Sequence, residues 1–91
     1  METRKIRLEA GRIAERSEMA AYMKELFGFS KSYRGSLDGL YDYLSEVCEY
    51  TDICVDNHTM FLICQQDFAW DVLKVISDAA LENPYLRVVI L

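Results

Sequence analysis

The chain has 91 residues, of which 52% are hydrophobic and 27% are charged, and its formal net charge at pH 7 is −5. This composition is typical of a globular protein, and the length suffices for a single domain, 1–91, with one modest core. No apolar run reaches the roughly 18 residues that cross a membrane, and no apolar signal segment follows the charged N-terminus. We therefore expect a cytoplasmic protein without membrane contact.

The charges are unevenly distributed along the chain. Residues 1–36 contain eight Lys or Arg and five Asp or Glu, a net charge of +3, whereas residues 37–91 contain two and ten, a net charge of −8. Because nucleic acids bind to basic surfaces, this acidic majority argues against direct nucleic-acid binding. A basic protein or a cation is the expected kind of partner.

The first third of the chain predicts a strand, a helix and a loop. Alternation of polar and apolar residues predicts a strand over Lys5–Leu8. A helix is predicted from Ser17, as the N-cap, to about Phe27, with Gly28 as its C-terminal stop. The loop that follows, 29–35, is rich in Ser, Gly and basic residues.

The next helix, predicted from Leu37 to about Val47, has two opposed faces. Ser36 is a favourable N-cap. The apolar face comprises Leu37, Leu40, Leu44, Val47 and Cys48, and the acidic face comprises Asp38, Asp42, Glu46 and Glu49. Like charges at this spacing repel, and no Lys or Arg interrupts them. The acidic face is therefore either a solvated helix surface or a docking surface for a positively charged partner.

The second half predicts two strands around a helical region. Asp52–Asp56 is a predicted strand, whereas Thr59–Cys64 could be a second strand of a hairpin or a short buried helix. Asp67 is the expected cap of a helix over 68–81, whose predicted core face comprises Phe68, Val72, Leu73, Ile76 and Ala80. Leu86–Leu91 is almost entirely apolar, as expected of a central strand or one covered on both faces.

This order of elements predicts an α/β fold with a three-stranded parallel sheet packed with helices. Helical crossovers between successive strands require parallel neighbours. We expect the strand at 5–8 to lie in the middle of the sheet.

The sequence contains no constellation typical of an enzyme or a metal protein. His58 is the only histidine and has no recognisable nucleophile motif beside it. Asp38, Asp42 and Glu46 could hold only a weakly bound, Mg²⁺-like ion. We therefore expect no catalytic residue, no metal site and no cofactor.

The cysteines and aromatic residues give two further expectations. Cys48, Cys54 and Cys64 are odd in number, lack C-x-x-C spacing and have apolar neighbours, which predicts buried, reduced thiols. Several aromatic residues lie near the acidic helix, and Tyr33 in the preceding loop is expected to point outward. Tyrosines beside acidic residues are typical of an interface hot spot, although a half-buried core edge is the alternative.

The segment from Leu37 to Asp42, with the sequence LDGLYD, resembles the L-D-x-L-aromatic-D signature of the barstar family of intracellular ribonuclease inhibitors. The resemblance extends to four further segments in the expected order: Lys24–Leu26, Glu49–Tyr50, Val72–Ala79 and Arg87–Leu91.

Membership of this family would imply both a fold and a mechanism. The fold is a three-stranded parallel sheet with helices, and the mechanism is insertion of the second helix and its preceding loop into a basic ribonuclease active site. By the same resemblance, Asp42 and Asp38 are the key carboxylates, Asp78 on the last helix supports them, and Tyr41 stands where the family carries Trp. In the loop, Arg34 replaces a glycine of the family and adds a positive charge beside the acidic surface.

We therefore expect a protein, monomeric when free, that inhibits a basic ribonuclease or nuclease toxin, as an immunity protein does. Its expected contact residues are Asp38, Asp42, Tyr33, Tyr41, Asp78 and Glu46. One alternative is a barstar-like interaction domain with a partner that is not a nuclease. The other is a small enzyme or metal protein.

Overall fold

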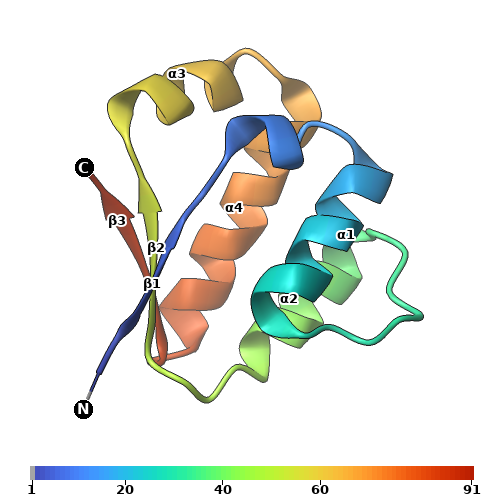
Figure 1. Ribbon diagram of the computed structural model, residues 1–91, viewed down its shortest axis with the longest axis vertical. Helices are drawn as coiled ribbons and strands as arrows, with labels where there is room; N and C mark the ends of the chain where they lie inside the picture. Colours follow the sequence, from blue (N-terminus) through green and yellow to red (C-terminus); the bar gives the residue numbers. More distant parts are fainter. Residues whose placement is uncertain (1) are drawn as a thin grey trace.

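The three predicted strands form one parallel sheet, and four α-helices connect and cover them (Figure 1). A computed structural model describes residues 2–91. The elements follow the order β1 (Arg4–Arg7), the short 3-10 helix η1 (Ala10–Arg12), α1 (Arg16–Phe27), α2 (Leu37–Ser45), β2 (Thr51–Val55), α3 (Asn57–Cys64), α4 (Asp67–Glu82) and β3 (Leu86–Ile90). The predicted α/β fold with a three-stranded parallel sheet is confirmed.

The strand order is β1-β2-β3, so β2 and not β1 lies in the middle, and the expectation of a central first strand is wrong. Each crossover moves the chain one strand further in the same direction. Right-handed crossovers in one direction place their helices on one face of a sheet. Figure 1 shows α1, α2 and α4 on the same side of the strands. The opposite face of the sheet has no helix packed on it in Figure 1.

β3 is therefore an edge strand, contrary to the expectation from its apolar sequence. Leu86 is buried, but Val88 and Val89 are only half-buried and Ile90 is 54% exposed. A short apolar run does not distinguish a central strand from an edge strand, because the covering elements lie far away in the sequence.

The caps of two helices differ from those predicted. α1 ends at Gly28 as expected, with the residue at φ 69° and its N–H donating to the carbonyl of Lys24. At the other end the N-cap is Glu15, which forms no side-chain cap hydrogen bond, and Ser17 lies inside the helix. α4 likewise begins at Asp67, so this residue occupies the first turn, where its negative charge favours the helix dipole, instead of capping it.

The ambiguous segment Thr59–Cys64 belongs to helix α3. The Asp56 carboxylate accepts the N–H of Thr59 at 2.7 Å and so caps this helix. Because the cap follows β2 directly, the chain turns into a helix without room for a hairpin. Hydrogen bonding to Thr59 also holds the pKa of Asp56 below its usual range.

The core lies between the sheet and the helices. α4 contributes Ala69, Val72, Leu73, Ile76 and Ala79, while the predicted core residues Phe68 and Ala80 are only partly buried. α2 contributes Leu40 and Leu44, and β2 contributes the alternate residues Thr51, Ile53 and Val55.

The prediction of buried thiols is wrong for two of the three cysteines. All three are reduced, but Cys48 and Cys64 are exposed and Cys54 is half-buried. α2 ends at Ser45, before the predicted Val47, so Cys48 leaves the apolar face of the helix. Cys64 is the last residue of α3.

Asp52, which is buried, and Arg87, which is exposed, form an ion pair on the uncovered face of the sheet. Arg87 donates from Nε at 3.0 Å and from Nη2 at 2.8 Å to the two carboxylate oxygens of Asp52, whose side chain is almost inaccessible. The parallel register also aligns Lys5 with Asp52. Hydrogen bonding to Arg87, more than the charge of Lys5, holds the pKa of Asp52 below its usual range.

This pair predicts a pH-dependent contribution to stability. A carboxyl group whose pKa is lowered by folding stabilises the protein above its unfolded pKa, and this stabilisation disappears as the pH falls through the folded value. We therefore expect Asp52→Asn to lower the melting temperature at about pH 7 and to have a smaller effect at about pH 3. Thermal melts at both pH values test this, with Asp71→Asn at an exposed position of α4 as the control. An equal loss at both pH values would contradict it.

Candidate protein-binding surface

The acidic helix α2 is fixed at its start and along its buried side. Ser36 Oγ accepts the N–H of Gly39 at 3.0 Å, which confirms the predicted cap. Leu40 and Leu44 are fully buried, and α2 packs directly against α4. The helix therefore has one defined orientation relative to the core.

The acidic residues of α2 lie on its exposed side. Asp38 and Asp42 are exposed within the helix, and Glu46, also exposed, is its C-cap. Within residues 2–91, none of the three forms an ion pair with a Lys or Arg. These carboxylates are therefore accessible to an external cation.

Tyr33 does not point outward, so the expectation that it is presented to a partner is wrong. Only 4% of it is exposed, and its hydroxyl donates to the carbonyl of Ser36 at 2.8 Å. Burial raises its pKa to about 12, which keeps the phenol neutral. Its ring lies against Gly39, where a Cβ would come within 3.1 Å of the ring. Tyr33 therefore holds the loop and the start of α2 in place instead of contacting a partner.

Tyr33 belongs to an aromatic cluster beneath the loop. Phe29 stacks on Tyr43 with ring centroids 4.6 Å apart, and Tyr33 meets both rings edge-on at 5.3 and 5.5 Å. The expected clustering of aromatic residues near α2 is confirmed, but these three rings support the surface from below. Of the predicted contact tyrosines, Tyr41 is half-buried and keeps part of its surface accessible.

Because Gly35 has no side chain, the loop that precedes α2 can lie directly against the start of α1. Its φ is 95°, and a Cβ there would lie 2.6 Å from the carbonyl oxygen of Arg16. Sequence reasoning did not identify this contact, because it joins residues that are far apart in the chain.

We expect Gly35→Ala to lower the free energy of unfolding by about 2–4 kcal/mol, because it adds both backbone strain and a steric overlap. Gly11→Ala is the matched control, since a Cβ at Gly11 meets nothing within 4 Å and its φ is not positive. Urea denaturation measures both variants. Equal stability of the two would contradict the proposed constraint.

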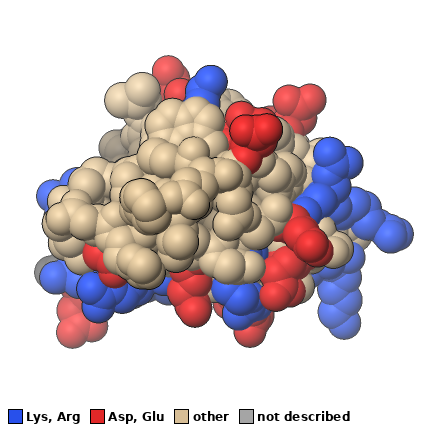
Figure 2. All heavy atoms as spheres, turned by 90° about the horizontal axis from the view of Figure 1, so that it is seen from above, with Lys and Arg blue, Asp and Glu red and all other residues tan. Residues whose placement is uncertain are grey.

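Basic residues lie next to the acidic helix. Lys31 and Arg34 in the loop are exposed, as is Arg16 at the start of α1, and in the described part of the chain none of the three forms an ion pair. Figure 2 shows blue and red side chains side by side at the right edge of the molecule, the side on which α1 and α2 lie in Figure 1. This surface therefore has two regions of opposite charge.

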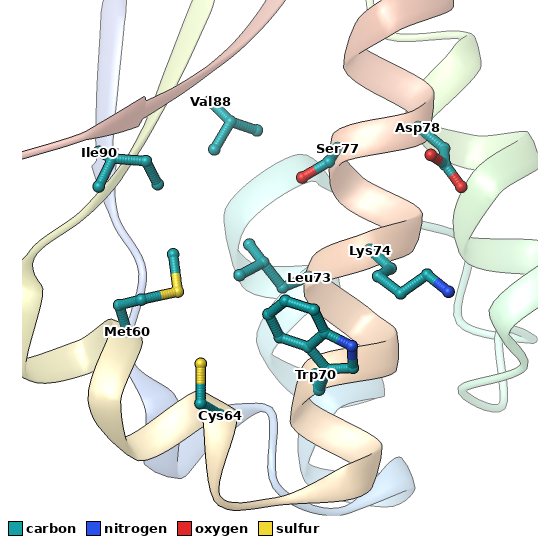
Figure 3. A pocket seen from close by; sticks show the side chains of 9 residues that line it. All are labelled: Met60, Cys64, Trp70, Leu73, Lys74, Ser77, Asp78, Val88 and Ile90. Carbon is teal, nitrogen blue, oxygen red and sulfur yellow. The ribbon is translucent and has the colours of Figure 1, made fainter.

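Asp78, the predicted supporting carboxylate, lies on α4, the helix against which α2 packs. It is exposed, and it lies on the flank of α4 at the rim of the cavity beside β3, which it helps to line (Figure 3). It belongs to a second element, so the predicted acidic residues do not all share one helix face.

In the part of the chain that the structure describes, neither a metal-binding cluster nor a membrane-spanning helix is present. Within residues 2–91, no three His, Cys, Asp or Glu side chains are arranged to hold a metal ion. Over the same range, no helix combines the length and apolarity needed to span a bilayer.

The sequence matches no model of a known protein family and no curated protein. The likeness to the barstar family therefore rests on the motif from Leu37 to Asp42, on the four further segments and on the order of the elements.

Proposed function

We propose that this protein is a non-enzymatic inhibitor that covers the basic active site of a ribonuclease or nuclease toxin in the cytoplasm. Exposed carboxylates on a rigidly held helix, Asp38, Asp42 and Glu46, carry this proposal, because no cation among the described residues pairs with them. The barstar-like signature in the same helix supports a nuclease as the partner. Asp78 and the accessible part of Tyr41 complete the contact surface.

The energetics of α2 favour this use. Acidic residues spaced one turn apart repel each other, and those near the C-terminal end of a helix also oppose its dipole. Cations of a partner remove both penalties on binding, so the interaction is electrostatically steered and sensitive to salt. Because Tyr33 and the cap at Ser36 already fix the loop and the helix, little ordering is required on association.

A second candidate function is binding to a basic protein that is not a nuclease. Arg34 favours it, since this exposed cation lies in the loop that would approach the basic enzyme. The two candidates share the acidic surface and differ in whether binding blocks catalysis.

The test is to titrate the protein into purified basic ribonucleases and to measure both binding and residual RNA cleavage, at about 50 mM and about 500 mM salt. The triple variant Asp38→Asn, Asp42→Asn, Glu46→Gln is expected to lose binding and inhibition. A control with the same net charge, Asp67→Asn, Asp71→Asn, Glu82→Gln, changes exposed acidic residues of α4 and should retain both.

Each outcome decides between the candidates. Binding with full inhibition supports the inhibitor, whereas binding that leaves RNA cleavage intact favours the second candidate. Equal losses in the two triple variants would show that only net charge matters and would contradict a specific acidic surface.

A further inference from the structure

The outer edge of β3 has free hydrogen-bonding groups. The carbonyl of Tyr85 accepts from Thr51 of β2, and the N–H of Leu91 donates to Val55 of β2. Because alternate residues of a parallel strand face the same neighbour, Val88 and Ile90 direct their N–H and C=O groups away from β2. Among the described residues, these groups have no backbone partner.

The two edges of the sheet differ in how they are protected. β1 carries three basic residues, Arg4, Lys5 and Arg7, and charged side chains on an edge strand prevent pairing with another chain. β3 carries only Arg87, which is engaged by Asp52. An apolar edge without such protection is typical of a strand that pairs with another strand.

Apolar hollows lie on both halves of β3. One cavity of about 330 Å³, shown in Figure 3, is lined mainly by Met60, Cys64, Trp70, Leu73, Val88 and Ile90. A second hollow of about 340 Å³ lies between Ala80, Leu81, Leu86 and Val88. Trp70 is 43% exposed and Leu81 is 83% exposed. Ser77 and Val88 line both hollows and so mark the centre of this surface.

We propose that this edge binds a second copy of the same chain, with the two β3 strands antiparallel about a two-fold axis at Val88. In this register the two Val88 residues exchange both of their backbone hydrogen bonds. The N–H of Ile90 donates to the carbonyl of Leu86 in the other copy, whose own N–H is already bound to Asn83. Arg87 lies opposite Val89 of the second copy, so no like charges face each other.

The helix layer is self-complementary about the same axis. Leu81 lies one turn after Ser77 on α4, and Leu73 lies one turn before it. The two-fold axis therefore places Leu81 of one copy at the cavity beside Leu73 of the other. The small side chain of Ser77 allows the two helices to approach closely. Lys74 and Asp78, also on this flank, bring opposite charges from the two copies together.

A second copy fits this surface better than an unrelated partner, because the backbone register, the hollows and the charges are all matched by the surface itself. Pairing of β3 with β1 of another copy would instead place β3 against the basic edge. No residue of α2 lines either hollow, so the carboxylates of α2 stay accessible in the dimer, whereas Asp78 lies at the rim of the dimer surface. The proposal replaces the expectation of a monomeric free chain and does not depend on the proposed inhibitor function.

Sedimentation equilibrium of the full chain over a range of concentrations tests the proposal. The wild type is expected to show a monomer–dimer equilibrium, which Leu81→Lys and Ile90→Lys each weaken at least about tenfold. Phe61→Lys is the matched control, since Phe61 is 61% exposed on α3 and lines neither hollow. Thermal melts verify that the variants fold.

Hydrogen exchange provides a second, backbone readout. The amides of Val88 and Ile90 are expected to exchange more slowly as the protein concentration rises, whereas exchange at the exposed edge of β1 stays constant. A monomer at all concentrations would overturn the proposal, as would a dimer that is disrupted by Phe61→Lys and not by the other two substitutions. Protection that is independent of concentration would also overturn it.

Discussion

Asp42→Ala is expected to weaken binding to a basic ribonuclease more than any other single substitution on the acidic surface. Asp42 is exposed in the middle of α2, where a partner's cations would surround it. Removing it would leave those cations buried and unpaired, which costs about 2–5 kcal/mol, a range to which barstar complexes themselves contribute. This corresponds to an increase in Kd of about 30-fold to several thousand-fold.

The same substitution should leave the fold almost unchanged. Asp42 forms no ion pair within residues 2–91, and its removal relieves repulsion from Asp38 and Glu46. Isothermal titration at low and high salt measures the Kd, with Asp71→Ala as the control for the loss of one negative charge. Equal affinity of the two variants would contradict the role of Asp42. A large fall in melting temperature would instead show that Asp42 is structural.

A large loss of stability is also expected from Asn83→Ala. Asn83 is 5% exposed, and its Nδ2 donates at 2.9 Å to the carbonyl of Leu44 in the last turn of α2 and to that of Val47 just after the helix. Its Oδ1 accepts the N–H of Tyr85 at 2.9 Å. Alanine would remove all three hydrogen bonds and leave carbonyl groups without donors in a poorly solvated site. We expect a loss of about 2–4 kcal/mol in the free energy of unfolding.

Urea denaturation measures this loss directly. Asn57→Ala is the control, because Asn57 is exposed at the start of α3 and, among the described residues, its side chain forms no hydrogen bond. A loss below about 0.5 kcal/mol for Asn83→Ala, the size of an ordinary surface substitution, would contradict the structural role.

Local features were predictable from the sequence. The cap at Ser36 and the C-terminal stop at Gly28 depend on neighbouring residues, and the structure confirms them. The two predicted faces of α2 are confirmed as far as Ser45, where the helix ends before the predicted Val47. The parallel arrangement was also predictable, since helical crossovers allow little else.

Features that depend on distant contacts were not predictable. The order of the strands depends on which face of the sheet the helices cover. The burial of Tyr33 depends on contacts with the rings of Phe29 and Tyr43 and on the absence of a side chain at Gly39. The placement of β3 at an edge follows from the same strand order. The segment Thr59–Cys64 was compatible with a strand or a short buried helix, and its partial exposure on α3 became clear only in three dimensions.

The bonds made by Asn83 also constrain when the acidic surface can form during folding. The amide of Asn83 and the carbonyl of Leu44 are 39 positions apart in the chain. The end of α2 is therefore held only after α4 and the turn into β3 have docked. Contacts between such distant positions form slowly, because a long loop must close first. A folding chain in which Asn83 has not yet docked thus lacks a fixed end for α2, and we expect binding competence to arise only after α4 and the turn into β3 have formed.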